Sequence, residues 1–452
     1  MSSSLSLRET WRLLILVGIC LGIIFNAFQG EGAPLVASVA FSGIVFAITY
    51  SFIRWLGPVF MKAGLKGRDM AKPRKPEIPE TMGAVCAIVY LLALIFFIPF
   101  AFYKDIVSAT SGGGNRDVVL EVEHVETGRM LHRFPHGKCI VILGIGDDLL
   151  DIRWRHKVLI PAFGAIPMLI VYFVDFGVTQ VVVPVPLQPY LGSFVDLGWL
   201  YYVYMAAVSI FCPNSINMLA GINGVEVAQS LVIALLLIAN DILYVAPITP
   251  FPHPATDSHL FSLYFLLPFV GVSAALLLHN WYPSKVFVGD TYCYFAGMVF
   301  AVVGILGHFS KTLLLLFIPQ IFNFLYSTPQ LFKLIPCPRH RLPRFNNITG
   351  LLDASVTEWT VPPSPLVAAA LDLLHGLRLA RVTKNEQGQI VESTNLTILN
   401  LWLIWWGPMR EDRLALSMAV VQLTCGLFGL FVRHRLALLV FREDNRAFRY
   451  QV

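Results

Sequence analysis

The sequence predicts an all-α polytopic membrane protein, with about ten transmembrane helices and a small cytosolic α/β insert before the last helix. Its 452 residues are 56% hydrophobic and only 13% charged, with a mean hydropathy of +0.68. A soluble domain of this length does not carry so much apolar surface. The apolar residues form continuous runs without two-residue alternation, which argues against a β-barrel. In lipid, such runs must be helical, because every backbone polar group needs an internal partner.

The individual spans follow from the thickness of the bilayer core, about 30 Å, which requires roughly 20 helical residues per crossing. Ten segments meet or approach this length. They are Trp11–Phe28, Pro34–Phe60, Gly83–Phe102, Lys157–Phe173, Gly198–Phe211, Val225–Val245, Leu260–His279, Cys293–Gly307, Leu313–Leu334 and Leu414–Phe431.

Four regions are expected along the chain: residues 1–32 as an N-terminal hydrophobic anchor or extension, 33–335 as a transmembrane catalytic core with cytosolic loops, 336–412 as a cytosolic insert, and 413–452 as the last transmembrane helix and tail. The first segment has the basic and apolar regions of a signal peptide, but no clear small-x-small cleavage site, so an uncleaved anchor is favoured over a cleaved one. The seven cysteines lie singly, which favours buried structural thiols over disulfides or zinc.

The distribution of basic residues sets the orientation. Loops 62–80, 147–157, 279–290 and 333–344 are rich in lysine and arginine and are therefore expected on the cytoplasmic side. Loops 104–138 and 177–196 are expected on the opposite face. In the insert, a strand-like segment Asn395–Leu401 leads into tryptophans expected at the membrane interface.

The strongest motif is the acidic and basic run 146–157. Asp147, Asp148 and Asp151 lie at helical spacing, with Lys157 and other cations one turn on. Ionisable groups beside hydrocarbon are costly and usually mark a site. Carboxylates together with cations suit a divalent metal and phosphates. The structural alternative is a juxtamembrane basic loop whose aspartates offset its charge. The run favours phosphoryl transfer at a membrane surface.

Two further loops carry polar groups at span ends. Segment 214–224, with Asn217, Gly221 and Asn223, is expected as a loop that offers amides and a close backbone approach. Its alternative is a helix–helix turn in which these residues only cap. In segment 281–291, Asp290 is a candidate metal ligand or a helix N-cap, and Phe287 a candidate stacking platform for a base.

A proline-rich basic loop, 336–344, contains Arg339, His340 and Arg341. Prolines stiffen the backbone and hold the arginines out for bidentate phosphate contacts. The alternative is a positive-inside anchor. The cations of loop 62–75, Lys72 among them, are interpreted mainly as orientation charges.

Taken together, these motifs resemble the eukaryotic UDP-N-acetylglucosamine–dolichyl-phosphate N-acetylglucosamine-1-phosphate transferases, within the polyprenyl-phosphate sugar-1-phosphate transferase superfamily. The resemblance runs from Leu65–Asp69 to Gly407–Asp412, and the Thr110–Gly114 loop and N-terminal segment resemble fungal members. The resemblance implies Mg²⁺-dependent, tunicamycin-sensitive transfer of GlcNAc-1-phosphate from UDP-GlcNAc to dolichyl phosphate. It also implies a multi-pass protein of the endoplasmic reticulum membrane, with the active site facing the cytosol.

The resemblance also implies roles for single residues. Asn217 and Asp290 would hold Mg²⁺, Lys157 and Arg339 would bind phosphates, and His340 and Arg341 would shape the GlcNAc pocket. Gly221, Asn223 and Phe287 would hold uridine, and Asp147 would position or deprotonate the acceptor phosphate. Asp148 and Asp151 are second-rank candidates near the acceptor, and Lys72 and Glu80 match the family's first cytosolic loop.

The chain departs from the family just before Asp147. Members have a full span there, whereas about a dozen residues are missing here between His136 and Val141. The eight residues Cys139–Gly146 make only about 12 Å of helix, which cannot cross. The segment is either a re-entrant stub buried in protein or the remainder of an incomplete helix, and a shortened gene model is favoured over a real deletion.

Other functions remain as alternatives. One is an undecaprenyl-phosphate sugar-1-phosphate transferase, and another is a transporter with intramembrane carboxylates. The acids lie at span ends and no repeat is visible, which disfavours the transporter. Expected partners are UDP-GlcNAc, dolichyl phosphate and the lipid bilayer, without nucleic acid. The oligomeric state is left open, with a homodimer as one candidate.

Overall fold

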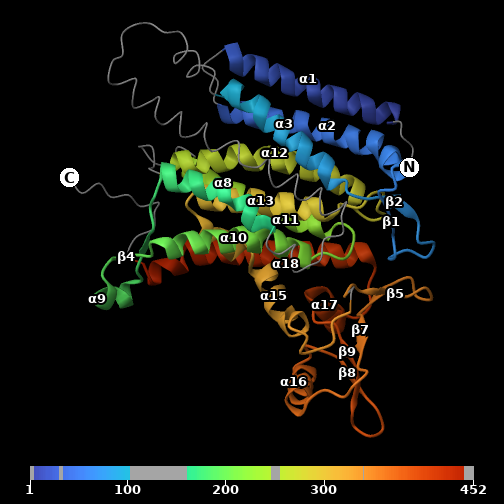
Figure 1. Ribbon diagram of the computed structural model, residues 1–452. Helices are drawn as coiled ribbons and strands as arrows, with labels where there is room; N and C mark the ends of the chain where they lie inside the picture. The colour runs from blue at the N-terminus through green and yellow to red at the C-terminus, as the bar shows by residue number, and fades with distance from the viewer. Residues whose placement is uncertain (1–4, 30–33, 102–159, 246–254, 339–340, 442–452) are drawn as a thin grey trace.

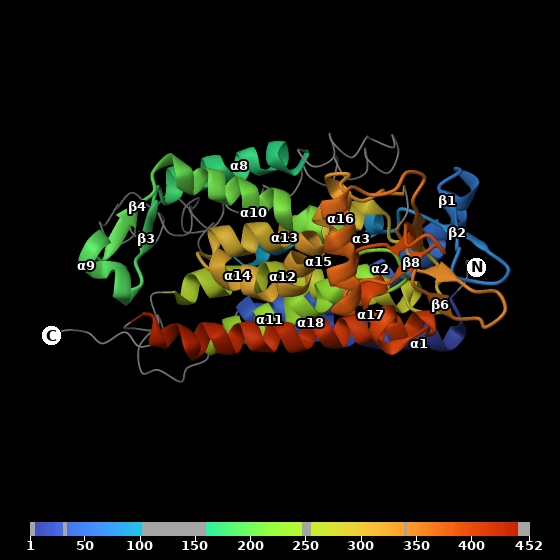
Figure 2. The same ribbon diagram turned by 90° about the horizontal axis from the view of Figure 1, so that it is seen from below.

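A computed structural model describes residues 5–29, 34–101, 160–245, 255–338 and 341–441 of the chain. In this part, long helices lie side by side as a bundle, and a smaller α/β unit lies beside one end of it (Figures 1 and 2). The bundle helices are α1 (Leu7–Gln29), α2 (Pro34–Lys62), α3 (Gly83–Ala101), α8 (Ile160–Asp175), α10 (Trp199–Met218), α11 (Val225–Val245), α12 (Thr256–Asn280), α13 (Asp290–Leu306), α14 (Ser310–Leu316), α15 (Ile318–Leu331) and α18 (Glu411–His434), after which comes the short η3 (Leu436–Leu439).

A helix overlaps each of the ten predicted spans, so the polytopic helical class is confirmed. Among the described residues, five helices are long and apolar enough to cross a membrane. A sixth crossing results if α14 and α15, bent by 69°, count as one span. The remaining helices are shorter or less apolar, so the number of ten crossings stays a prediction.

Close helix contacts at glycines hold the bundle together. On α12, a Cβ at Gly271 would lie 2.5 Å from the carbonyl oxygen of Ser42 on α2. On α13, Gly297 lies directly against the backbone of Pro213 on α10. Small residues allow helix backbones to approach closely in membranes, where van der Waals contact contributes much of the association energy. The α10–α13 contact matters most, because both helices end at the candidate site.

Short hairpins mark the two ends of the bundle (Figure 1). At one end, β1 (Lys66–Arg68) pairs antiparallel with β2 (Glu77–Pro79). At the other, β3 (Gln180–Val182) pairs with β4 (Phe194–Asp196), with η2 (Val185–Leu187) and α9 (Gln188–Leu191) between them. Loops 62–80 and 177–196 therefore lie at opposite ends, as the charge pattern predicts. Loop 104–138 and run 147–157 lie outside the described residues.

The segment before α18 forms an α/β unit. Strand β5 (Arg344–Phe345) pairs with β6 (Leu352–Asp353). A three-stranded sheet has the order β7 (Val356–Glu358), β9 (Ile390–Thr394), β8 (Val382–Lys384). Helix α16 is Pro365–Gly376 and α17 is Ile398–Trp406.

The predicted strand at Asn395–Leu401 is wrong, because α17 begins there. Thr397 caps α17, and its side chain accepts a hydrogen bond from the backbone of Asn400. Leu399 and Leu403, one turn apart, are both buried. Capping and helical burial therefore override the local preference for a strand.

Candidate functional site

The contact between α10 and α13 brings Asn217 and Asp290 to the same end of the bundle. The two helices run antiparallel (Figure 1). Asn217 lies about one turn beyond the contact at Pro213, and Asp290 about two turns before the contact at Gly297. Both residues therefore lie toward the end that carries β1 and β2. Two hard oxygen donors from different helices lie at this end.

The predicted loop at 214–224 is half wrong, since α10 continues through Met218. The side chain of Asn214 donates to the carbonyl of Ile210 at 2.7 Å, and Ser215 Oγ donates to Cys212 at 3.0 Å. These hydrogen bonds stay within α10 and stabilise the helix on both sides of Pro213. Asn217 thus projects from a helix end, and the true loop is 219–224.

Asp290 is the first residue of α13, whereas the N-cap position belongs to Gly289, with φ +73°. The N-cap interpretation of Asp290 is therefore wrong. A carboxylate in the first helical turn is still favoured by the helix dipole.

The segment before α13 is tied to β2 and the start of α3. Phe287 donates from its backbone to Pro79 at 2.8 Å, and Met82 donates to Phe287 at 3.2 Å. A Cβ at Gly67 of β1 would lie 2.9 Å from the Phe287 ring and 3.2 Å from a carboxylate oxygen of Glu80. A glycine is thus needed at position 67, where the β1–β2 hairpin meets the ring of Phe287 and the carboxylate of Glu80. Burial, and then the charge of Asp290, raise the pKa of the Glu80 carboxyl.

Asn223 is the centre of a buried polar network. Its backbone N–H and side-chain Nδ2 donate to Glu411 Oε1 at 2.9 and 2.8 Å, and Nδ2 also lies 3.2 Å from Asp69 Oδ2. Asp69 is 1% exposed and Glu411 2%. Lys72 forms an ion pair with Asp69 and lies 3.8 Å from Glu411. Two buried acids, one lysine and one amide therefore join the first loop, the α10–α11 loop and the start of α18.

Gly221 joins this loop to the proline-rich loop. It has φ +133° and its N–H donates to Glu226 at 3.2 Å. A Cβ there would overlap the side chain of Leu342. The backbone carbonyl of Arg341, next to Leu342, accepts from Asn400 at 3.0 Å. Only glycine allows this backbone conformation and this approach together.

The guanidinium of Arg341 is partly buried, and burial lowers its pKa. Its Nη1 is buried and has no hydrogen-bond partner among the described residues. A buried donor without a partner is costly, and an anionic ligand would satisfy it.

Eight predicted site residues are described, and the contacts above place them at one end of the bundle: Lys72, Glu80, Asn217, Gly221, Asn223, Phe287, Asp290 and Arg341. The other six, Asp147, Asp148, Asp151, Lys157, Arg339 and His340, lie outside the described residues, so their roles stay predictions. Sequence reasoning missed Asp69 and Glu411 as site residues. The available signal was an acid at the edge of an apolar stretch, which Glu411 shares with Asp290.

Asn217 and Asp290 fit a magnesium ion. In the described part of the chain no three His, Cys, Asp or Glu side chains gather as a metal cluster. Mg²⁺ rarely needs one, because it is usually bound through one or two protein oxygens together with waters and substrate phosphates. One carboxylate and one amide oxygen at adjacent helix ends match that pattern.

A helical membrane bundle with carboxylates, amides and cations gathered at one end is compatible with a membrane-embedded transferase, and comparison with known proteins shows the family to which the chain belongs. The family model for Glycosyl transferase family 4 matches residues 136–308. The chain is 50% identical over 448 residues to the UDP-N-acetylglucosamine–dolichyl-phosphate N-acetylglucosaminephosphotransferase of Saccharomyces cerevisiae, covering 96% of this chain and 98% of that protein. Identity to the protein of the same name is 51% in Schizosaccharomyces pombe, over 92% of this chain and 95% of that one, and 39% in Dictyostelium discoideum, over 88% and 89%. The chain belongs to this family of phosphotransferases.

Proposed function

We propose that this protein transfers GlcNAc-1-phosphate from UDP-GlcNAc to dolichyl phosphate, giving GlcNAc-PP-dolichol and UMP. This is the first step of the lipid-linked oligosaccharide pathway for protein N-glycosylation. The observation that carries the proposal is the 50% identity to a relative named for this activity, over nearly the full length of both chains. The site supports it with acids, amides, an aromatic ring and cations at one end of a membrane bundle.

The reaction exchanges one phosphorus–oxygen bond for another. An oxygen of dolichyl phosphate attacks the β-phosphorus of UDP-GlcNAc, and the bond from that phosphorus to the bridging oxygen breaks. UMP leaves with the electron pair. A lipid phosphate is already largely ionised at pH 7, since its second pKa is about 6. Positioning and charge neutralisation therefore matter more than a general base.

On the donor side, Asn217 and Asp290 would hold Mg²⁺, which when bound neutralises charge on the pyrophosphate. Phe287 would stack on uracil, and Gly221 and Asn223 would hold uridine. Lys72 and Glu80 lie close by, in loop 62–80. Arg341 would meet the GlcNAc-phosphate with its unpaired Nη1.

The remaining roles fall on residues outside the described part of the chain. Asp147 would position the acceptor phosphate, with Asp148 and Asp151 nearby, and Lys157 and Arg339 would bind phosphates. His340 would help to shape the sugar pocket. The basic loops favour a cytosolic site in a protein of about ten spans in the endoplasmic reticulum membrane, and the α/β insert would lie on the same side.

The test is one assay on membranes that contain the full-length protein. We expect Mg²⁺-dependent, tunicamycin-sensitive transfer of labelled GlcNAc-phosphate from UDP-GlcNAc to dolichyl phosphate. Asp290→Ala should abolish it. Asp257→Ala is the matched control, because Asp257 is also in the first turn of a long helix, α12, but at the other end of the bundle. No transfer by the wild type would contradict the proposed reaction, and full activity of Asp290→Ala would contradict the metal assignment.

A further inference from the structure

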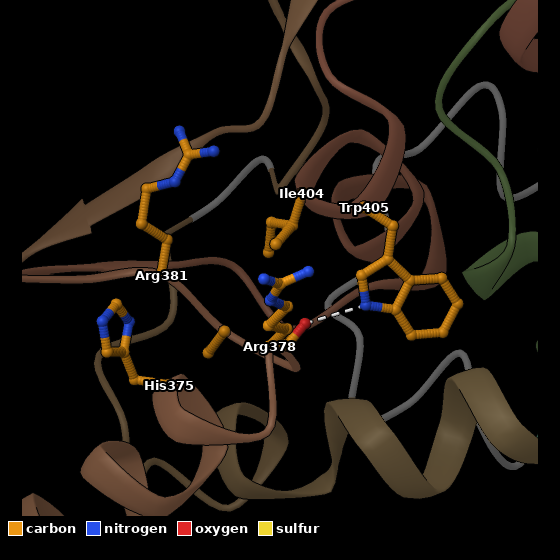
Figure 3. Close-up of a pocket in the computed structure, with 6 residues that line it drawn as sticks. His375, Arg378, Arg381, Ile404 and Trp405 are labelled. Atoms are coloured by element: carbon orange, nitrogen blue, oxygen red, sulfur yellow. Dashed lines mark hydrogen bonds between the residues drawn. The ribbon is translucent and has the colours of Figure 1, made fainter.

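The α/β unit contains a cavity that the transfer reaction does not use. It has a volume of about 350 Å³ and is lined by His375, Arg378, Ala380, Arg381, Ile404 and Trp405. Figure 3 shows these side chains, which come from the end of α16, the segment leading to β8, and α17. The lining combines two guanidinium groups and an imidazole with apolar and aromatic surface.

The two arginines are available for an anion. Neither guanidinium forms an ion pair with a described residue, and the nearby carboxylate of Asp372 is already paired with Lys384 at 2.8 Å. His375 Nδ1 accepts a hydrogen bond from the backbone of Val382 at 3.2 Å. The neutral imidazole therefore carries its proton on Nε2, where it is a donor. Forked guanidinium donors with an added N–H suit the oxygens of a phosphate.

The backbone conformation of Arg378 is unusual for a residue other than glycine. Arg378 follows the C-cap of α16 and has φ +56°, a position and conformation that favour glycine. The indole N–H of Trp405 donates to the carbonyl of Arg378 at 2.8 Å and holds this conformation (Figure 3). An arginine at a position that favours glycine is consistent with a role for its side chain in the cavity.

The surroundings of the cavity favour a lipid over a soluble ligand. Leu366, Leu373 and Leu377 lie along one outward face of α16 and its end, and Leu366 is 80% exposed. Trp406, next to the cavity on α17, is 69% exposed. In Figure 1, α16 lies farther than β5 from the end of the bundle that carries β1 and β2, toward the level of the apolar helices. Exposed leucines and tryptophans beside unpaired arginines are typical of a surface in contact with lipid headgroups.

We propose that the cavity between α16 and α17 binds the phosphate of an anionic phospholipid headgroup, with Arg378 and Arg381 as its ligands and Trp405 as its aromatic wall. This contact fixes the α/β unit against the membrane surface. The cavity is separate from the residues assigned to sugar-phosphate transfer, so its occupation and the transfer reaction can be measured independently.

Binding can be tested on the purified full-length protein in detergent. The probes are soluble short-chain phosphatidylinositol, short-chain phosphatidylcholine and inorganic phosphate, each titrated by microscale thermophoresis. We expect binding of phosphatidylinositol and little response to the other two. Arg378→Gly and Arg381→Gln should each weaken it about tenfold, the loss expected for one charge-assisted hydrogen bond. Arg378→Gly also relieves the strained backbone, so its midpoint of thermal unfolding should be no lower than that of the wild type.

Lys333→Gln is the matched control, because it removes one exposed positive charge just after α15 that forms no ion pair with a described residue and does not line the cavity. Equal weakening in Lys333→Gln would overturn the proposal in favour of general charge attraction. Equally tight binding of inorganic phosphate would overturn the lipid assignment. Arg378→Gly and Arg381→Gln should retain transferase activity in the assay above, which separates a failure of this proposal from a failure of the proposed reaction.

Discussion

Glu411 holds Asn223 twice, through the backbone N–H at 2.9 Å and the side-chain amide at 2.8 Å, although the two residues are 188 positions apart. One buried carboxylate thus fixes both the position of the α10–α11 loop and the orientation of the amide in it. Lys72 pairs with Asp69 and lies 3.8 Å from Glu411, so one cation faces two buried carboxylates around this contact.

Replacing Glu411 with alanine should raise the KM for UDP-GlcNAc about tenfold and lower kcat less. The substitution leaves buried donors unsatisfied, at a cost of about 1–3 kcal/mol, and frees the loop proposed to hold uridine. Glu411→Gln keeps an acceptor oxygen and should recover part of the affinity. Asp412→Asn, at the half-buried neighbour that pairs with Arg410, is the control. A similar rise in the KM for UDP-GlcNAc in that control would contradict this role.

Replacing Gly297 with alanine should reduce both transfer activity and thermal stability. The new Cβ would lie 2.6 Å from the carbonyl carbon of Cys212 and still closer to Pro213, so α10 and α13 must separate and shift Asn217 away from Asp290. Initial rates and the midpoint of thermal unfolding in detergent measure the two effects. Gly18→Ala, where a Cβ meets open space, should leave activity unchanged and stabilise slightly, by about 0.5–1 kcal/mol.

Replacing Phe287 with leucine should weaken the binding of UDP, because stacking of a base on an aromatic ring contributes about 1–3 kcal/mol. Isothermal titration calorimetry with UDP measures the change, and Phe287→Tyr, which keeps the aromatic face, should bind nearly as the wild type does. Leucine binding as tightly as phenylalanine would exclude the ring as a stacking platform.

The raised pKa of Glu80 predicts a pH dependence of stability. Because burial raises the pKa in the folded state, the folded protein binds this proton more tightly than the unfolded chain does. Stability from this group is greatest below the unfolded value of about 4.3 and falls as pH rises from there through the folded pKa. Glu80→Gln removes the titration. The unfolding midpoint of Glu80→Gln minus that of the wild type should therefore increase with pH across this window.

A difference in unfolding midpoint that stays constant with pH would mean that Glu80 is not buried as a carboxyl. Glu77→Gln is a useful comparison, because the lysine at position 66 lowers the pKa of Glu77 and should give the opposite trend.

The sequence was informative where one physical rule dominates. Long apolar runs must be helical in a bilayer, and each of the ten expected runs overlaps a helix. The sequence was misleading where neighbours decide. A span ending at Phe211 and a loop from Asn214 were expected, yet α10 continues through Met218, with Gly297 of α13 packed against the backbone of Pro213. Asn395–Leu401 suggested a strand, yet the cap at Thr397 and burial of one helical face give α17.

The candidate site was likewise predictable where local sequence decides and unpredictable where distant residues decide. Polar residues at span ends predicted Asn217, Asn223 and Asp290, because such groups are rare beside hydrocarbon. The pairing of Asn223 with Glu411 could not be predicted, since no local pattern links residues so far apart. The shared position of Gly67, Phe287 and Glu80 depends on how β2 pairs with the chain before α13, which is likewise non-local.

The apolar cluster beneath the α/β unit has a practical consequence. Leu352, Leu399 and Leu403 of that unit share one buried cluster with Ile222 of the α10–α11 loop and Leu414 of α18. The α/β unit therefore supports the α10–α11 loop, and deleting it would remove the apolar side chains against which that loop packs. A fluorescent tag placed in the exposed turn at Asn385–Gly388 should leave the enzyme intact. A tag placed at Gly407 should instead separate α17 from α18 and disrupt their packing.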